Sequence, residues 1–142
     1  MKIKLFFAIT AILLTLVAII IFVKPPERRF TLDSEDVDNP NIPRIQKAAE
    51  EGNAEAQFAY GHCLLTGNNI PENKPEGVKW LQKSADQGFA IAQSELGSCY
   101  YYGEGIAQDK EKGIALIKQG VQNGFTKAQR WLDVIEEKEN NN

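Results

Sequence analysis

His62 and the two cysteines are the side chains of this sequence with the widest chemical repertoire, since they could form a nucleophile with its base or part of a zinc site. His62 is the only histidine, Cys63 follows it directly, and Cys99 lies 36 residues later. Consecutive residues of a helix point in different directions, so His62 is poorly placed to activate Cys63. Zinc needs four ligands, usually at short spacings, which these three residues do not supply. We therefore predict a protein that is not an enzyme and has no catalytic residue, metal or cofactor.

Calcium and nucleic acids are also disfavoured as ligands. The acidic run over residues 33–38 lacks the glycine and the closing glutamate that an EF-hand loop requires. The chain has 16 basic and 19 acidic residues and a net charge of −3. Neutralisation of phosphate charge dominates nucleic-acid binding, so this balance argues against a nucleic-acid partner. The sequence contains no P-loop and no Gly-x-Ser-x-Gly motif, and we expect no small-molecule substrate.

The elements that carry these residues repeat every 36 positions. Glycines recur at positions 52, 88 and 124, alanines at 56, 92 and 128, and glutamines at 57, 93 and 129. A period of this length in helical sequence predicts stacked helical hairpins, each of which needs a neighbour to bury its apolar face. Helices are expected over about 43–51, 54–66, 74–87, 90–102, 110–123 and 126–138. Such arrays are surfaces that hold other molecules.

Local signals within the repeats support this interpretation. Asn73 and Asp109 are N-cap candidates at equivalent positions, and Asn69 matches Gly105 where a left-handed backbone is expected. Small residues should let neighbouring helices approach closely, namely Ala56, Gly61, Ala92 and Gly97. Large apolar residues should fill the hairpin interiors, namely Tyr60, Leu64, Trp80 and Leu81 in one repeat and Leu96, Tyr100, Leu116 and Ile117 in the next.

The two cysteines occupy equivalent positions in successive repeats. Stacked helices lie about 8–10 Å apart, whereas a disulfide needs Cα atoms within about 7 Å. Cys63 and Cys99 are therefore expected to be buried free thiols.

The repeated positions form a longer pattern. The second repeat carries it at Ala92, Leu96, Gly97, Tyr100, Gly103, Gly105, Ile106, Asp109 and Lys112, and the first at Ala56, Gly61, Gly67, Ile70, Trp80, Lys83, Ala85 and Gly88. This pattern resembles the Sel-one-like repeat family, a relative of the tetratricopeptide repeats. The resemblance implies an all-α fold, a right-handed superhelix of about two and a half helical hairpins. It also implies a scaffold or adaptor that binds another protein.

Several positions depart from the family pattern, among them Tyr60 in place of the usual leucine and Leu64 in place of the usual tyrosine. Gly77 and Gly113 stand where the family prefers alanine inside a helix, at an expected cost of about 1 kcal/mol each. Asp133 stands in the last helix where a packing glycine would fall, which suits a closing cap.

Residues 5–23 contain no charged side chain and would form a helix of about 28 Å, close to the thickness of a hydrocarbon core. No small residue marks a cleavage site after them, so we predict an uncleaved transmembrane signal-anchor rather than a signal peptide. A short tail (1–4) precedes this helix, and a proline-containing acidic linker (24–42) follows it. The repeat domain covers 43–138, with repeats at about 52–87 and 88–123 between flanking half-repeats, and a polar tail (139–142) ends the chain.

Basic residues flank the predicted anchor on both sides in nearly equal number, so the positive-inside rule does not fix its orientation. Many bacterial relatives look exported or membrane-attached. The resemblance therefore implies a single-pass inner-membrane protein whose repeat domain is periplasmic or otherwise extracytoplasmic. The expected function is a protein–protein interaction scaffold or adaptor at the cell envelope. The alternative is an immunity or inhibitor protein that sequesters a toxic effector enzyme there.

The partner-binding surface follows from the faces of the first helices. If Ala56, Tyr60 and Leu64 point inward, the opposite face carries Phe58, His62 and Leu65, with Ser94, Ser98 and Tyr101 at equivalent positions and Tyr102 and Arg130 nearby. In the family, the first helices line the concave face, so the resemblance implies that these residues contact the partner. Phe58 and Tyr101 are expected to be exposed anchors, because aromatic side chains concentrate binding energy. Ordinary packing is the alternative for both.

Overall fold

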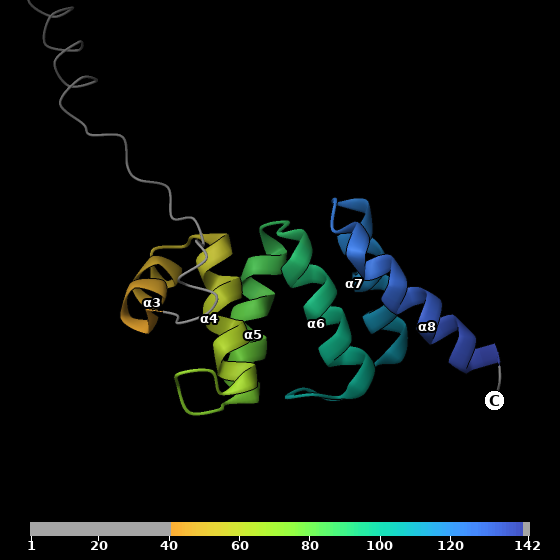
Figure 1. Cartoon of the computed structure of the whole chain (residues 1–142), viewed down its shortest axis with the longest axis horizontal. Coiled ribbons are helices and arrows are strands. Elements are labelled where there is room, and N and C mark those ends of the chain that lie inside the picture. Colours follow the sequence, from red (N-terminus) through yellow and green to blue (C-terminus); the bar gives the residue numbers. More distant parts are fainter. Residues whose placement is uncertain (1–40, 141–142) are drawn as a thin grey trace, which may run out of the picture.

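The computed structural model describes residues 41–140, which fold into a row of helices without a strand in that range. Its elements are α3 (Ile42–Glu50), α4 (Ala54–Thr66), α5 (Lys74–Asp86), α6 (Ala90–Tyr102), α7 (Lys110–Gln122), the 3₁₀-helix η1 (Thr126–Ala128) and α8 (Gln129–Asn140). Figure 1 shows them stacked along the long axis of the molecule, from α3 at one end to α8 at the other. The expected all-α stack of helical hairpins is confirmed.

Each complete hairpin has a first and a second helix. These are α4 and α5 in one hairpin and α6 and α7 in the next, while α3 is a second helix and α8 a first helix. The predicted anchor (5–23) and most of the predicted linker lie outside the described residues. None of the helices within residues 41–140 has the length and apolar character needed to cross a membrane.

The helix ends follow the local signals in the sequence. The side chains of Asn73 and Asp109 accept hydrogen bonds from backbone N–H groups three residues later, at 3.3 and 3.0 Å. Asn69 and Gly105 both have positive φ, at 57° and 69°. The two differ in surroundings, because a Cβ on Gly105 would lie 2.7 Å from the carbonyl carbon of Lys74. Glycine at position 105 therefore allows one repeat to touch the start of α5 in the previous repeat.

Glycine pairs set the spacing within each hairpin. A Cβ on Gly61 would lie 2.9 Å from the carbonyl oxygen of Gly77, and a Cβ on Gly77 would lie 2.8 Å from that of Gly61. Gly97 and Gly113 show the same relationship at 2.6 Å in both directions. These backbones touch where α4 crosses α5 and α6 crosses α7. Gly77 and Gly113 are thus packing residues, a role that the sequence pattern did not indicate beside their expected cost in helix propensity. Gly61 and Gly97 meet the second helix of their own hairpin.

Two clusters of buried side chains form the core. One lies between the hairpins and the other joins α6, α7 and α8; their members are Val78, Leu81, Ala85, Ala92, Leu96 and Cys99, and Tyr101, Ile117, Ala128, Leu132 and Ile135. The predicted interior residues Leu64, Leu81, Leu96 and Ile117 are buried. By contrast, Tyr60 and Trp80 are partly exposed and pack edge to face, with ring centroids 5.4 Å apart.

Both cysteines are free and buried, as their spacing predicted. Burial raises the pKa of the Cys63 thiol and raises that of Cys99 to about 12. The thiolate is the reactive form of cysteine, so neither side chain is activated as a nucleophile at neutral pH.

Two buried glutamines link successive hairpins. Gln57 Nε2 donates to the carbonyl oxygen of Ala49 at 3.1 Å, and Gln57 Oε1 accepts from Gln87 Nε2 at 2.7 Å. Gln93 repeats the arrangement with the Ala85 carbonyl oxygen at 3.3 Å and Asn123 Nδ2 at 2.7 Å. We call these two sets of bonds the amide ladder. Each rung satisfies a buried amide and fixes the position of three helices.

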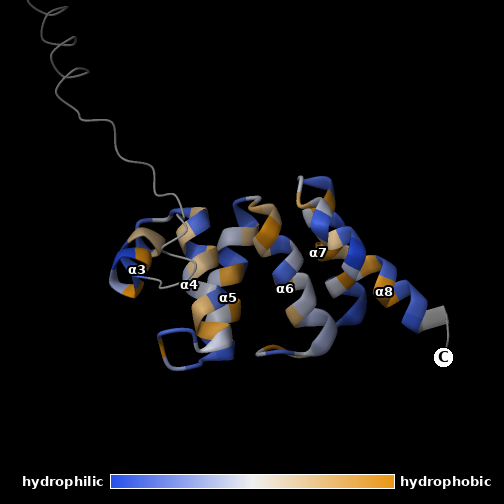
Figure 2. Cartoon of the chain, viewed as in Figure 1, coloured by the Kyte–Doolittle hydropathy of each residue, from blue (hydrophilic) through white to orange (hydrophobic). Residues whose placement is uncertain are grey.

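The third equivalent glutamine does not form a rung. Gln129 is exposed, and its Nε2 donates to Asp133 Oδ1 within α8 at 3.0 Å. Hydrophobic and hydrophilic residues succeed one another along α8 in Figure 2. One side of this helix packs on α7, and another remains open to solvent.

Candidate interaction surface

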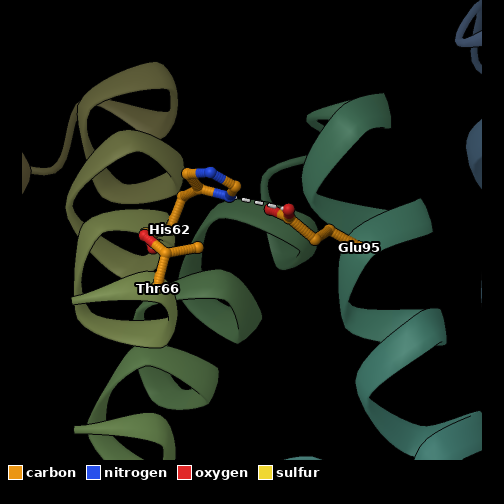
Figure 3. Close-up of polar contacts among 3 residues, drawn as sticks. All are labelled: His62, Thr66 and Glu95. Atoms are coloured by element: carbon orange, nitrogen blue, oxygen red, sulfur yellow. Dashed lines mark hydrogen bonds and ion pairs between the residues drawn. The ribbon is translucent and has the colours of Figure 1, made fainter. Parts of the chain in front are cut away.

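The first helices α4, α6 and α8 carry every residue that the sequence assigned to the partner-binding face. At the junction of α4 and α6, His62 Nδ1 lies 2.7 Å from Glu95 Oε1. Figure 3 shows the imidazole of His62 directed at the Glu95 carboxylate on the neighbouring helix. Thr66 Oγ1 donates to the His62 carbonyl oxygen at 2.9 Å and lies one turn further along α4. His62 therefore joins two hairpins and is partly withdrawn from solvent.

The contact with Glu95 also shifts the pKa of His62. The hydrogen bond with Glu95 raises the pKa of His62, and the negative charge of that carboxylate acts in the same direction, against the effect of burial. The second oxygen of Glu95, Oε2, is buried without a hydrogen-bond partner among the described residues. The Glu95 carboxylate thus favours the protonated form of the His62 imidazole.

Phe58 and Leu65 are partly buried packing residues. The Phe58 ring lies 5.5 Å from that of Phe89 and 5.9 Å from that of His62, measured between centroids. Both Phe58 and Leu65 pack against the core between the hairpins. Phe58 is thus held by its own molecule, in keeping with ordinary packing rather than with an exposed anchor.

Two other predicted surface residues are buried. Tyr101 is 5% exposed and belongs to the core cluster with Ile117 and Leu132, and Ser94 is completely inaccessible. The expectation that Tyr101 is an exposed anchor is therefore wrong, as is the placement of Ser94 on the surface. The physical reason is that α6 packs against α5, α7 and α8 on different sides and therefore has more than one buried face.

The remaining predicted residues meet in a groove between α6 and α8, of about 370 Å³. Its lining consists of Ser98, Tyr102, Ile117, Arg130, Trp131, Val134 and Ile135. We call it the α6–α8 groove. Ser98, Tyr102 and Arg130 were expected on the partner-binding face, and the structure brings them together. Trp131 and Val134 were missed, although their three-residue spacing on a helix could have revealed a common face.

The exposed apolar surface of the described residues is concentrated at this groove. Tyr102, Trp131 and Val134 are the large hydrophobic residues that remain exposed, at 54%, 40% and 43%. All three line the groove, with Ile117 and Ile135 buried beneath them. Clustered apolar side chains with a polar edge are typical of interaction sites, whereas single exposed apolar residues are not informative.

A metal centre finds no support in residues 41–138. No three side chains of histidine, cysteine, aspartate or glutamate come together there as a group that could hold an ion.

Comparison with known proteins places these observations in a family. Residues 54–89 and 90–125, together half of the chain, each match the Sel1 repeat. A Sel1 repeat protein from Oxalobacter formigenes is 35% identical with a TM-score of 0.61, over 64% of this chain and 26% of its own. A protective antigen present in uropathogenic Escherichia coli strains, which displays an SLR fold, is 31% identical with a TM-score of 0.65, over 76% of this chain and 23% of its own.

This chain therefore spans about a quarter of the length of those two structures. Cysteine-rich protein B of Helicobacter pylori shares the fold, with a TM-score of 0.58, 13% identity and coverage of 68% of this chain and 70% of its own. No curated protein matches this chain significantly.

Proposed function

Because this chain belongs to the Sel1 repeat family, we propose that it is a membrane-anchored scaffold or adaptor that binds another protein at the cell envelope. Sel1 repeat proteins generally mediate protein–protein interactions, and their fold is typically a non-enzymatic scaffold. The two matched repeats supply the stacked surface that such a role needs.

The observation that carries the proposal is the α6–α8 groove. Its three exposed apolar side chains, Tyr102, Trp131 and Val134, come from two helices that are distant in sequence. Aromatic side chains and arginine are the residue types that contribute most to binding energy at protein interfaces. The groove holds two such aromatic side chains and Arg130.

The chemistry of the reactive side chains supports binding over catalysis. Cys63 and Cys99 are buried with raised pKa values, and His62 is engaged with Glu95 on the neighbouring helix. No other thiol or imidazole occurs in the sequence. A nucleophile with an adjacent base is therefore not assembled from these groups.

The membrane part of the proposal rests on residues 5–23 and the exported orientation on family resemblance. Extraction of membranes at high pH should leave the full chain in the membrane pellet. A reporter fused after Asn142 should be active only if it functions outside the cytoplasm. Activity of a cytoplasm-only reporter at that position would reverse the proposed orientation.

Protein binding is tested with a photo-crosslinking residue placed at position 102 of the full chain in its native envelope. The matched control places it at Lys118, an exposed residue of α7 that does not line the groove. The expected result is a discrete crosslinked protein from position 102 that is absent from position 118. Identical products from both positions, or none from position 102, would contradict the proposal. A crosslinked enzyme that this chain inhibits would assign the neutralising role instead.

A further inference from the structure

We propose that the α6–α8 groove binds a short segment of a partner protein in which bulky apolar side chains are flanked by carboxylates. This inference rests on the proposed function, because it specifies the partner of the same surface. It follows from three features: the size of the groove, the charge along its edge and the end of the helical stack.

The size of the groove favours a short segment. Its volume of about 370 Å³ lies near the lower end of the range for ligand pockets, about 300–1,000 Å³. Buried Ile117 and Ile135 form an apolar floor, and Tyr102 and Trp131 stand at its edges. The Trp131 ring is also held edge-on to Phe125, with centroids 6.1 Å apart. A few large apolar side chains would fill this space and cover the exposed rings.

The charge at the groove is positive. Arg130 is the only charged residue in its lining, which contains no carboxylate. Lys127, which lies in η1, precedes Arg130 by three residues and adds a second positive charge near this end of α8.

The acidic residues of α8 lie outside the groove lining. Glu136 falls on the opposite side of the helix, whereas Asp133 and Glu137 follow Arg130 by three and seven residues and lie beside it on the side away from the groove. The chain as a whole has a net charge of −3, so the basic edge is a local feature. A guanidinium binds carboxylates through paired hydrogen bonds, which makes an acidic segment the complementary ligand.

The end of the stack disfavours a second copy as the occupant. A further helix packed on α8 as α5 packs on α4 would need a glycine at the position of Gly61 and Gly97. Asp133 occupies that position, and its carboxylate accepts from Gln129. The backbones could not touch there, so the described helices do not provide the hairpin contact for another copy of the repeat.

The chain itself contains one segment of the proposed chemistry. Residues 30–38 include Phe30, Leu32 and four carboxylates and lie outside the described residues. The segment precedes α3 in the sequence, and α3 lies at the end of the stack opposite to α8 (Figure 1). The first described residues of the chain thus lie away from the groove. A separate partner is therefore the proposed occupant, and the chain's own segment is the competitor to be tested.

The experiment selects ligands from a phage-displayed library of random dodecapeptides on the full chain in detergent micelles. Pools are selected in parallel on the Arg130→Glu variant and on the Lys118→Glu control, which changes an equivalent charge at an exposed position of α7. We expect the unchanged chain and the control to enrich peptides with Phe, Leu or Trp next to Asp or Glu. Synthetic versions should bind about tenfold more weakly to Arg130→Glu, and also when their acids are replaced by amides.

Several outcomes would overturn this inference. Enriched peptides without carboxylates, or equal affinity for Arg130→Glu, would refute the acidic chemistry while leaving protein binding at the groove intact. Failure to enrich any peptide on the unchanged chain would refute the short-segment ligand.

The competing occupants are tested with two further measurements. Tighter binding of the selected peptides after deletion of residues 30–38 would assign the groove to the chain's own segment. A change in oligomeric state on substitution of Trp131 would assign it to a second copy. The two proposals can fail separately. If the selection enriches the expected peptides but position 102 gives no crosslinked protein in the native envelope, the proposed function is contradicted and the peptide-binding groove is not.

Discussion

Gly97 and Gly113 face each other where α6 crosses α7, so closely that a Cβ on either would lie 2.6 Å from the carbonyl oxygen of the other. The same relationship joins Gly61 and Gly77 one repeat earlier. The 36-residue period therefore preserves a backbone contact in addition to side-chain packing.

Replacing Gly113 with alanine should destabilise the protein even though alanine is the better helix former. Relief of the clash requires the helices to separate, at a cost of about 1–3 kcal/mol that exceeds the gain of about 1 kcal/mol in helix propensity. Urea unfolding measured by circular dichroism tests this. As a control, Ala115→Gly at an exposed position of α7 should cost about 1 kcal/mol through helix propensity alone. A Gly113→Ala variant more stable than the unchanged protein would refute the close crossing.

The amide ladder offers a matched pair of substitutions. Gln93→Ala removes a buried side chain together with its bonds to the Ala85 carbonyl oxygen and the Asn123 amide and should cost about 1–3 kcal/mol. Gln129→Ala, at the equivalent but exposed position, should change stability by less than about 0.5 kcal/mol. Equal effects in thermal unfolding would mean that the ladder does not stabilise the stack.

The bond between His62 and Glu95 predicts a dependence of stability on pH. The pKa of His62 is raised in the folded state, so its contribution is fully present below the unfolded pKa of about 6.5 and is lost as pH rises through the higher folded pKa. The effect should stay below about 1 kcal/mol, because the His62 side chain is 45% exposed.

Unfolding measured between about pH 5.5 and 8.5 should show this loss in the unchanged protein and not in His62→Gln. Glu95→Gln should also remove it, since the carboxylate is the cause of the shift. A loss of the same size in His62→Gln would show that another group is responsible.

Tyr101 and Tyr102 should respond differently to substitution despite being neighbours. Tyr101→Ala removes a core residue and should cost about 3–5 kcal/mol, whereas Tyr102→Ala removes a side chain that is 54% exposed and should cost less than about 1 kcal/mol. Thermal unfolding of both variants provides the comparison. Similar losses would contradict the burial of Tyr101 and the exposure of Tyr102.

The sequence predicted the helices well because glycines and caps mark their ends at a constant period. The ranges expected for the two inner first helices, 54–66 and 90–102, coincide with α4 and α6. The last helix was less predictable, because residues 126–128 form η1 before α8 begins at Gln129. No N-cap side chain marks that start, and Phe125 precedes η1 without a side-chain hydrogen bond.

The interaction surface was predicted only in part. A helical wheel assigns one buried side to each helix, but Tyr101 is enclosed because three other helices surround α6. Trp131 and Val134 are exposed because no other helix of the described residues covers them. The sequence of α8 alone does not show whether a covering helix is present. The bond between His62 and Glu95 joins residues 33 positions apart, a separation that the 36-residue period does not single out.

The amide ladder also determines how the stack would respond to mechanical load. Its two rungs join neighbouring hairpins only, so a force pulling the chain ends apart would act on them in series. The tension is the same at both ends of the stack: the Gln57 rung holds α3 through Ala49, whereas Gln129 forms no rung at α8. Stretching should therefore detach the terminal helices α3 and α8 before α6 and α7.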